Sequence, residues 1–205
     1  MTNQNKDAIF LDRKNTALLL VDHQVGLLSG VRDMKTAELK ANLVALIRAA
    51  KVFNIPIIVT NVSPEIWGEF IPEAAAEIPD IKVIKRTLVN AWDDPAVVAA
   101  VEATGRKQLL IAGISFEVCA GFPALSSKAA GYDSRVALDA CGTFNEAKRL
   151  TGLMRLQAAG VQVVDYATAM TEILYDNADP LAGPAYGAMN MDFANIVYQI
   201  KAGVK

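Results

Sequence analysis

Short apolar runs along the chain alternate with stretches in which apolar residues recur every three or four positions. The runs fit strands that are buried on both faces of a parallel sheet, and the longer spacing fits one face of a helix. The expected strands are Ala17–Val21, Ile57–Thr60, Ile81–Ile84, Leu109–Ala112, Arg135–Leu138 and Val161–Tyr166. Because strands alternate with helices, the pattern predicts a three-layer α/β fold built on a parallel sheet.

Turn residues mark where the expected helices begin and end. One helix is expected around Leu39–Phe53. Another begins at Asp94, which can cap a helix whose first position is Pro95, and ends at Gly105. Residues 61–80 contain three prolines and are expected to form an irregular loop with a short helix.

The stretch Leu109–Tyr132 combines a strand, a break and a helix. After Gly113 the spacing of the apolar residues becomes that of a helical face, formed by Val118, Phe122, Leu125 and Ala129. Cys119 is therefore expected in the first turn of a helix, just beyond the carboxyl end of a strand. There the partial positive charge of the helix would favour the thiolate, which is the nucleophilic form. A role as a small buried side chain explains Cys119 equally well from this stretch alone.

Composition and charge restrict the class of protein. The chain has 205 residues, is 53% apolar and carries 20 basic against 22 acidic residues. A single domain over residues 1–205, with a large core and no nucleic-acid surface, is therefore expected. No apolar run is long enough to span a bilayer, and the polar N-terminus lacks the apolar core of a signal peptide.

The cysteines and the histidine narrow the chemistry further. Two cysteines are too few for a disulfide framework, so we expect a reducing cytoplasm. His23 is the single histidine, which excludes multi-histidine zinc sites and makes any Cys/His dyad depend on that residue. We therefore expect neither a metal nor another cofactor.

Polar residues follow three of the expected strands. Asp22 follows the first, Lys85 and Arg86 follow the third, and Cys119 follows the fourth. Since parallel strands place their carboxyl ends on one edge of a sheet, these side chains can converge. A carboxylate could then take the thiol proton, while a cation would stabilise the thiolate and keep the carboxylate ionised. Each residue also has an ordinary explanation, as a cap, a surface charge or part of the core.

Four segments carry a resemblance to a known family. They are Leu18–Leu28 (LLLVDHQVGLL), Arg86–Pro95 (RTLVNAWDDP), Leu109–Phe144 (beginning LLIAGISFEVCAGF) and Ala158–Val164 (AAGVQVV). On these segments the chain resembles the isochorismatase-like cysteine hydrolases, in their YcaC-like branch, over residues 8–170. The resemblance implies a six-stranded parallel sheet of Rossmann-like topology, flanked by helices.

The resemblance also implies a site. Its catalytic triad would be Asp22, Arg86 and Cys119. A cis peptide bond would join Ile114 to Ser115 and would turn backbone N–H groups near Ser115 and Cys119 toward an oxyanion.

The resemblance leaves two candidates for the basic residue of the triad, because the wider family usually has Lys at that position. Arg86 aligns best by its distance to the segment 90–92, and Lys85 remains the alternative. Neighbouring residues on a strand face opposite ways, so only one of them can serve. Arg cannot lose its proton and would act as a fixed charge. Nicotinamidases of the superfamily bind a metal through Asp and His residues, and His23 alone does not supply such a set.

The sequence leaves the substrate pocket and the reaction as hypotheses. The pocket candidates are Asn90, Trp92, Phe116 and Trp67, and ordinary core or interface positions explain them equally well. The main hypothesis is a cysteine-dependent hydrolase that cleaves a C–N bond in a small amide-like substrate through a covalent acyl-enzyme. The alternatives are a thiol redox or sensor protein that uses Cys119 and Cys141, and a non-catalytic oligomeric scaffold of the same fold.

Residues 171–205 form a tail beyond the last expected strand. It contains the apolar segment Met189–Ile200, which has no strand partner in the pattern. We expect this tail to be either an oligomerisation contact or a lid. With the resemblance, the expected partners are a small-molecule substrate and further copies of the chain, as a tetramer or octamer, with no nucleic acid and no membrane.

Overall fold

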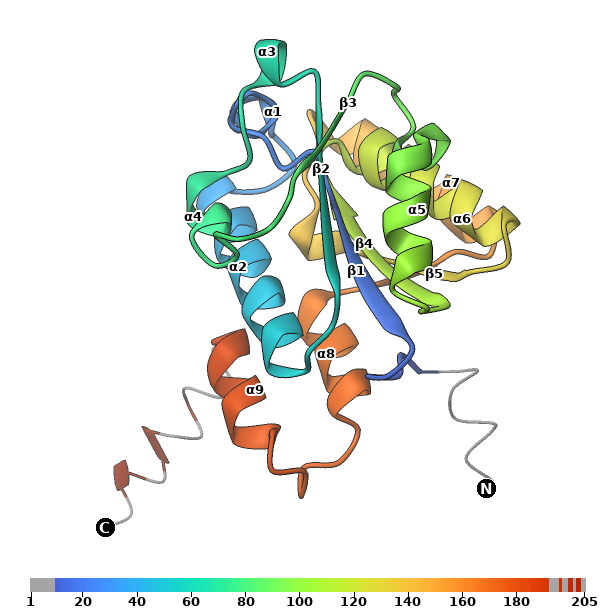
Figure 1. The fold of residues 1–205 in the computed structure, drawn as a ribbon. Helices are drawn as coiled ribbons and strands as arrows, with labels where there is room; N and C mark the ends of the chain where they lie inside the picture. The colour runs from blue at the N-terminus through green and yellow to red at the C-terminus, as the bar shows by residue number, and fades with distance from the viewer. Residues whose placement is uncertain (1–9, 192–195, 197–198, 201, 204–205) are drawn as a thin grey trace.

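A sheet of six parallel strands forms the centre of the molecule (Figure 1). The computed structural model describes residues 10–191, 196, 199–200 and 202–203. The strands are β1 (Thr16–Val21), β2 (Ile57–Val62), β3 (Ile84–Arg86), β4 (Gln108–Gly113), β5 (Asp133–Ala137) and β6 (Gln162–Val164). Their order is β3-β2-β1-β4-β5-β6, with every neighbouring pair parallel. The predicted fold class is therefore confirmed, and the order is that of a doubly wound, Rossmann-like sheet.

The two central strands explain why their sequences read as continuous apolar runs. Every residue of β1 and of β4 is buried, since each strand has a neighbour on both edges and helices on both faces. Each fully buried Leu, Ile or Val side chain contributes about 1.5–3 kcal/mol of transfer free energy. These strands therefore hold the carboxyl edge of the sheet on a rigid base.

Helices cover both faces of the sheet (Figure 1). One layer contains α2 (Thr36–Val52), α8 (Tyr166–Leu174) and α9 (Ala182–Met189), and the other contains α5 (Pro95–Ala103), α6 (Gly121–Ala129) and α7 (Glu146–Ala158). Three short helices are α1 (Val25–Gly30), α3 (Pro64–Trp67) and α4 (Pro72–Ala75). The start of α5 is as predicted, because the Asp94 side chain accepts a hydrogen bond from the Ala96 N–H at 2.9 Å.

Several boundaries differ from the predicted ones. The third strand begins at Ile84 and not at Ile81, and it includes Arg86. The sixth ends at Val164, because Asp165 caps α8 by accepting from the Thr168 N–H at 2.8 Å. The region 61–80 holds two short helices, α3 and α4, where one was expected.

Part of the C-terminal tail packs within its own chain. α9 contacts α2, and the Tyr166 hydroxyl of α8 donates to the Met189 carbonyl at 2.9 Å. The expected apolar segment Met189–Ile200 lies partly outside the described residues, at 192–195 and 197–198. In the described part of the chain, no helix has the length and apolar character required to cross a membrane.

Candidate active site

The ends of β1 and β4 lie at the point in the sheet where the order of the strands reverses. The chain proceeds from β1 through β2 to β3 on one side, and from β4 through β5 to β6 on the other. Asp22 follows β1 directly, and Cys119 lies in a short turn, η3 (Phe116–Ala120), just after β4. Ligands of open α/β sheets bind at this crevice. The topology therefore brings an acid and a thiol to the expected binding position.

Asp22 has an unusual backbone conformation. Its φ angle is 59°, in the left-handed region that residues with side chains seldom adopt, although Asp tolerates it better than most. The Asp22 N–H donates to the Thr60 carbonyl at 2.9 Å, and the Gln24 N–H donates to the Asp22 carbonyl at 2.8 Å. The backbone that carries the carboxylate is therefore fixed by hydrogen bonds from both of its polar groups.

A buried ion pair joins Asp22 to Arg86. Arg86 Nη2 donates to Asp22 Oδ2, and neither side chain is exposed. Thr60 Oγ1 donates to Asp22 Oδ1 at 3.0 Å. Arg86 Nη1 donates to the carbonyl oxygens of Leu88 and Val89. These contacts hold both side chains inside the protein. The Asp22 carboxylate and the Arg86 guanidinium therefore fix each other's orientation.

Lys85 lies on the outer side of β3. Its Nζ is 2.8 Å from Glu69 Oε1, and both side chains are more than half exposed. Since side chains alternate along a strand, the residue that follows Lys85 points inward. The structure thus places Arg86, and not Lys85, against Asp22.

Cys119 is buried, with 9% of its surface exposed, and the Asp22 carboxylate lies close enough to its thiol to act on the thiol's pKa. Burial, and then the negative charge of Asp22, raise the pKa of Cys119 far above its usual value, while Arg86 opposes this only weakly. The thiol therefore rests in its protonated form. The expectation that a helix N-terminus would favour the thiolate is wrong, because burial and the neighbouring carboxylate dominate.

The turn that carries Cys119 is a π-helical turn and not the first turn of an α-helix. The N–H groups of Val118, Cys119 and Ala120 all donate to the Ser115 carbonyl, at 3.3, 2.7 and 3.3 Å. Gly113 allows β1 and this turn to approach the end of β4, because a Cβ there would be 2.7 Å from the Val21 carbonyl oxygen and 3.2 Å from the Ala120 nitrogen. The helical spacing predicted from the sequence begins only with α6 at Gly121.

The peptide bond between Ile114 and Ser115 is cis. The Cys119 N–H donates to the Ser115 carbonyl within the turn, so it does not point to an open oxyanion position as expected. The Phe116 N–H likewise donates to the Gly142 carbonyl at 2.9 Å. The backbone donors nearest the thiol are thus used to hold the turn.

The two titratable neighbours of the crevice have opposite pKa shifts. Burial raises the pKa of Asp22, and the charge of Arg86 counteracts this only in part. Burial lowers the pKa of His23 to about 4, so that its ring is neutral. His23 Nε2 donates to the Ala140 carbonyl at 2.8 Å, which orients the ring toward Ala140 rather than into a dyad with the thiol. Of these two groups, Asp22 is therefore the one that interacts with the thiol.

The four pocket candidates have different surroundings. Phe116 is completely buried against α7, where a Cβ on Gly152 would be 2.8 Å from its ring, so it belongs to the core and not to the pocket. Trp92 packs edge-on against Tyr132, with ring centroids 5.2 Å apart. The Asn90 side chain accepts from the Trp92 N–H and donates to Ser126 Oγ at 3.0 Å.

Trp67, at the end of α3, is 39% exposed and lies close to α1, since a Cβ on Gly26 would be 2.6 Å from its carbonyl oxygen. Thr60, which the sequence reasoning missed, contacts Asp22 directly. Its signal was its position at the end of the strand next to β1.

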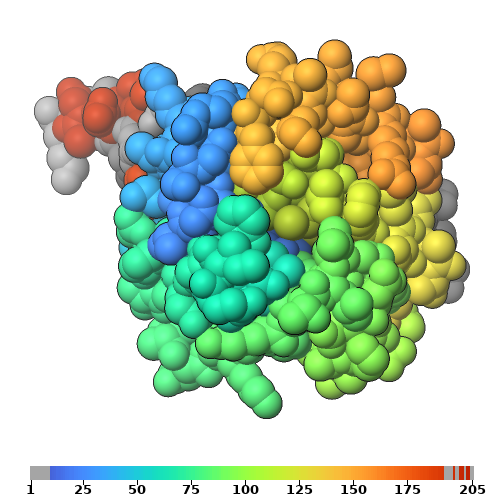
Figure 2. All heavy atoms as spheres, turned by 90° about the horizontal axis from the view of Figure 1, so that it is seen from above, coloured from blue at the N-terminus to red at the C-terminus, as the bar shows by residue number. Residues whose placement is uncertain are grey.

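The surface above the crevice is formed by the loops that follow the strands. Figure 2 shows α1, the α3 region, the loop after β3 and the segment after β4 meeting around a small hollow. A cavity of about 390 Å³ lies beside Arg86 and is lined by Pro64, Glu65, Lys85, Arg86, Thr87 and Asp94. Its lining includes Arg86 but neither Asp22 nor Cys119, so this cavity lies beside the proposed triad and not over the thiol.

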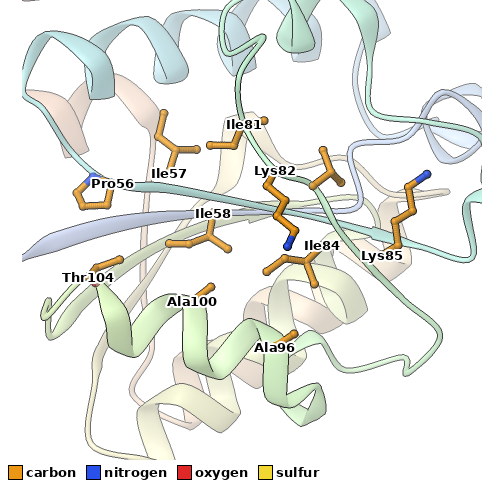
Figure 3. A pocket seen from close by; sticks show the side chains of 11 residues that line it. Pro56, Ile57, Ile58, Ile81, Lys82, Ile84, Lys85, Ala96, Ala100 and Thr104 are labelled. Carbon is orange, nitrogen blue, oxygen red and sulfur yellow. The ribbon is translucent and has the colours of Figure 1, made fainter.

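A second cavity, of about 620 Å³, lies along the edge of the sheet (Figure 3). Ile58 and Ile84 point from the strands toward Ala96 and Ala100 of α5. Its lining includes none of Asp22, Arg86 and Cys119. Across the described ranges, no group of three or more His, Cys, Asp or Glu side chains is arranged to hold a metal ion.

The fold and the site together define the class of protein. The chain matches the Isochorismatase domain family over residues 16–168, a range that contains Asp22, Arg86 and Cys119. The chain belongs to this family.

Three comparisons place it within the family. The protein of Escherichia coli (strain K12) called "Probable hydrolase YcaC" is 44% identical over 184 residues, 88% of each chain. The structure of the YcaC gene product from Escherichia coli, described as an octameric hydrolase of unknown specificity, matches with a TM-score of 0.89 at 40% identity, covering 95% of this chain and 97% of that one. YcaC from Pseudomonas aeruginosa, solved with hexane-2,5-diol and covalent acrylamide, matches with a TM-score of 0.87 at 38% identity, covering 94% and 98%.

Proposed function

We propose that this chain is a cysteine-dependent hydrolase that cleaves a C–N bond in a small amide-like substrate. One observation carries the proposal: Asp22, which is paired with Arg86 in the interior, lies beside the Cys119 thiol. A nucleophile beside a base, with the base oriented by a third group, is the arrangement that activates a thiol.

In the first half of the proposed reaction, Asp22 takes the thiol proton while Sγ of Cys119 bonds to the carbonyl carbon of the substrate. The carbonyl electrons move to oxygen and form a tetrahedral intermediate. When they return, the C–N bond breaks and the departing nitrogen takes the proton from Asp22. An amine leaves, and a thioester remains on Cys119.

In the second half, a water molecule gives a proton to Asp22 and bonds to the thioester carbon. The C–S bond breaks, the acid product leaves, and the sulfur recovers the proton from Asp22. Arg86 stays charged throughout and holds the carboxylate in position. Because burial raises the pKa of Asp22, this carboxylate is a stronger proton acceptor than an exposed one.

The covalent acrylamide in the Pseudomonas aeruginosa relative supports this proposal. Acrylamide is a small amide, and its alkene carbon bonds readily to thiols. In this chain both cysteines are free, and Cys119 is less buried than Cys141. Free thiols also fit the reducing cytoplasm that we propose as the compartment.

A substrate panel with matched variants tests the proposal. Amides, carbamates and hydroxamates are offered to the wild type, Cys119→Ser, Asp22→Asn and the control Cys141→Ser. We expect Cys119→Ser and Asp22→Asn to lose turnover by at least about 10³-fold and Cys141→Ser to retain it. Full turnover by Cys119→Ser would contradict the mechanism.

A further inference from the structure

A second segment at the carboxyl edge runs alongside the turn that carries Cys119. Gly142 forms a bridge with Ile114 and accepts a hydrogen bond from the Phe116 N–H at 2.9 Å. The Gly113 N–H donates to Cys141 Sγ at 3.2 Å. The segment 141–143 is thus attached to β4 and η3 along its length, although it contributes nothing to the proposed triad.

Glu117 connects this segment to the turn from the other side. Its Oε2 accepts from Thr143 Oγ1 at 2.6 Å, and its Oε1 accepts from Lys148 Nζ at 3.3 Å. The Glu117 side chain is 13% exposed, whereas that of Lys148 is 47% exposed. The bond to Thr143 is therefore the shorter and better shielded contact, and such bonds to a carboxylate are among the stronger ones.

Thr143 is itself held in one position. It is completely buried, its N–H donates to Asp33 Oδ1 at 2.7 Å, and its carbonyl accepts from the Arg32 N–H at 2.9 Å. Arg149 Nη1 in turn donates to Asp33 Oδ2 at 2.5 Å. Since each polar atom of Thr143 has a partner, its hydroxyl is a fixed anchor for Glu117.

The turn needs such an anchor. Its three consecutive N–H groups converge on the single carbonyl of Ser115 and do not form an α-helical ladder. Glu117 lies two residues before Cys119 in the same turn. We infer that Glu117 is a positioning residue, which, through Thr143, holds η3 so that the Cys119 sulfur faces Asp22. This inference rests on the proposed function, because it concerns the reactivity of that thiol.

Four variants and two measurements test the inference. Thr143→Val removes the hydroxyl and keeps the size, Thr143→Ser keeps the hydroxyl, Glu117→Ala removes the acceptor, and Lys148→Ala removes only the exposed partner. The measurements are the rate at which acrylamide modifies Cys119, followed by mass spectrometry, and the separate values of kcat and KM. Circular dichroism verifies that each variant is folded at the assay temperature.

We expect Thr143→Val and Glu117→Ala to slow acrylamide modification of Cys119 by about tenfold or more, and to lower kcat by a similar factor with KM nearly unchanged. Thr143→Ser and Lys148→Ala should remain close to wild type. If folded Thr143→Val and Glu117→Ala react and turn over as fast as wild type, the inference is wrong and the contact is only structural. The labelling rate needs no substrate, so it decides on Glu117 even if Cys119→Ser were to overturn the proposed hydrolase.

Discussion

Each residue of the proposed triad is buried, and its chemistry follows from that. The Cys119 thiol is protonated at rest, because burial and Asp22 raise its pKa. Its reaction with an electrophile therefore depends on a base that removes the proton as the sulfur attacks. The base in contact is Asp22, whose own pKa is raised by burial.

We expect acrylamide or iodoacetamide to modify Cys119 faster than Cys141 at neutral pH. Cys119 is slightly exposed and contacts a base, whereas Cys141 is completely buried and its thiol donates to the Ala137 carbonyl at 3.1 Å. Asp22→Asn should slow the modification of Cys119 and leave that of Cys141 unchanged. Peptide mapping by mass spectrometry measures both rates, and equally slow labelling of the two thiols would argue against a catalytic Cys119.

Arg86→Ala should be much more damaging than Lys85→Ala. Removing Arg86 leaves the Asp22 charge buried without a partner, which costs about 3–5 kcal/mol in comparable pairs, and Asp22 would then hold a proton and fail as a base. Lys85 only meets the exposed Glu69, a solvent-screened contact of the kind that contributes little to stability. Urea unfolding and the rate of Cys119 alkylation measure both effects. A larger loss with Lys85→Ala would reverse the assignment of the cation.

His23 should make the protein less stable at mildly acid pH. Its pKa is lowered from 6.5 in the unfolded chain to about 4 in the folded one. The unfolded chain thus binds the proton more tightly, and stability is lost as the pH falls from about 6.5 toward 4. At about 1.4 kcal/mol per unit, the loss is about 3 kcal/mol. Denaturant unfolding at several pH values should show this dependence, and His23→Gln, which keeps a donor for Ala140, should show less of it.

At the scale of elements, the strands that are apolar because they are buried could be predicted from the sequence. The strand bounds that depend on pairing, and the turns that depend on local backbone conformation, could not. β1 and β4 are apolar throughout because both faces are covered, so their positions were evident. β3 lies at the edge of the sheet, and its bounds are set by pairing of Thr60 with Ile84 and Val62 with Arg86. The apolar residues at positions 81–84 carry no information about that register, so they could not predict the bounds of β3.

The candidate site could likewise be predicted only in part from the sequence. That Asp22, Arg86 and Cys119 lie together could be predicted, because each lies at or just beyond the carboxyl end of a strand of one parallel sheet. The π-helical turn could not, because the helical spacing of the segment continues into α6. The raised pKa of Cys119 depends on how deeply the thiol is buried and on its contact with Asp22. Neither can be inferred from its position in the sequence.

Two helical glycines should respond in opposite ways to substitution by alanine. Gly152 lies at the close contact between α7 and η3, whereas Gly187 lies in α9. A Cβ on Gly152 would lie 2.8 Å from the Glu117 Cβ and from the Phe116 ring, so Gly152→Ala should destabilise the protein by about 1–3 kcal/mol. At Gly187 in α9, none of the described residues lies within 4 Å of that position, so Gly187→Ala should stabilise by about 0.5–1 kcal/mol through helix propensity. Thermal unfolding compares them, and a neutral Gly152→Ala would mean that α7 can move away from the turn.

For the whole molecule, the competing functions make different predictions about the thiols. A redox sensor would form a disulfide between Cys119 and Cys141 on mild oxidation, and a scaffold would contain an inert Cys119. In the structure both thiols are free, and Cys141 is used as an acceptor by the Gly113 N–H and as a donor to Ala137. These contacts favour a structural Cys141 and a reactive Cys119, which fits a hydrolase.

The surface around the crevice suggests self-association. Exposed apolar side chains follow three neighbouring strands at the carboxyl edge, namely Val25, Ile66, Trp67, Leu88 and Val89. An exposed apolar patch on a protein surface commonly marks an interaction site. A structurally similar relative is described as octameric. We propose that further copies of this chain cover the patch.

Light scattering at micromolar concentration should therefore show an oligomer. Val89→Glu should shift it toward smaller species, because a charge would be buried in an apolar contact, whereas Met154→Glu on the exposed face of α7 should not. A chain ending at Met191 tests separately whether the rest of the tail contributes. A monomeric wild type would refute self-association. Loss of assembly with Met154→Glu alone would instead place the interface on the α7 face, away from the proposed active site.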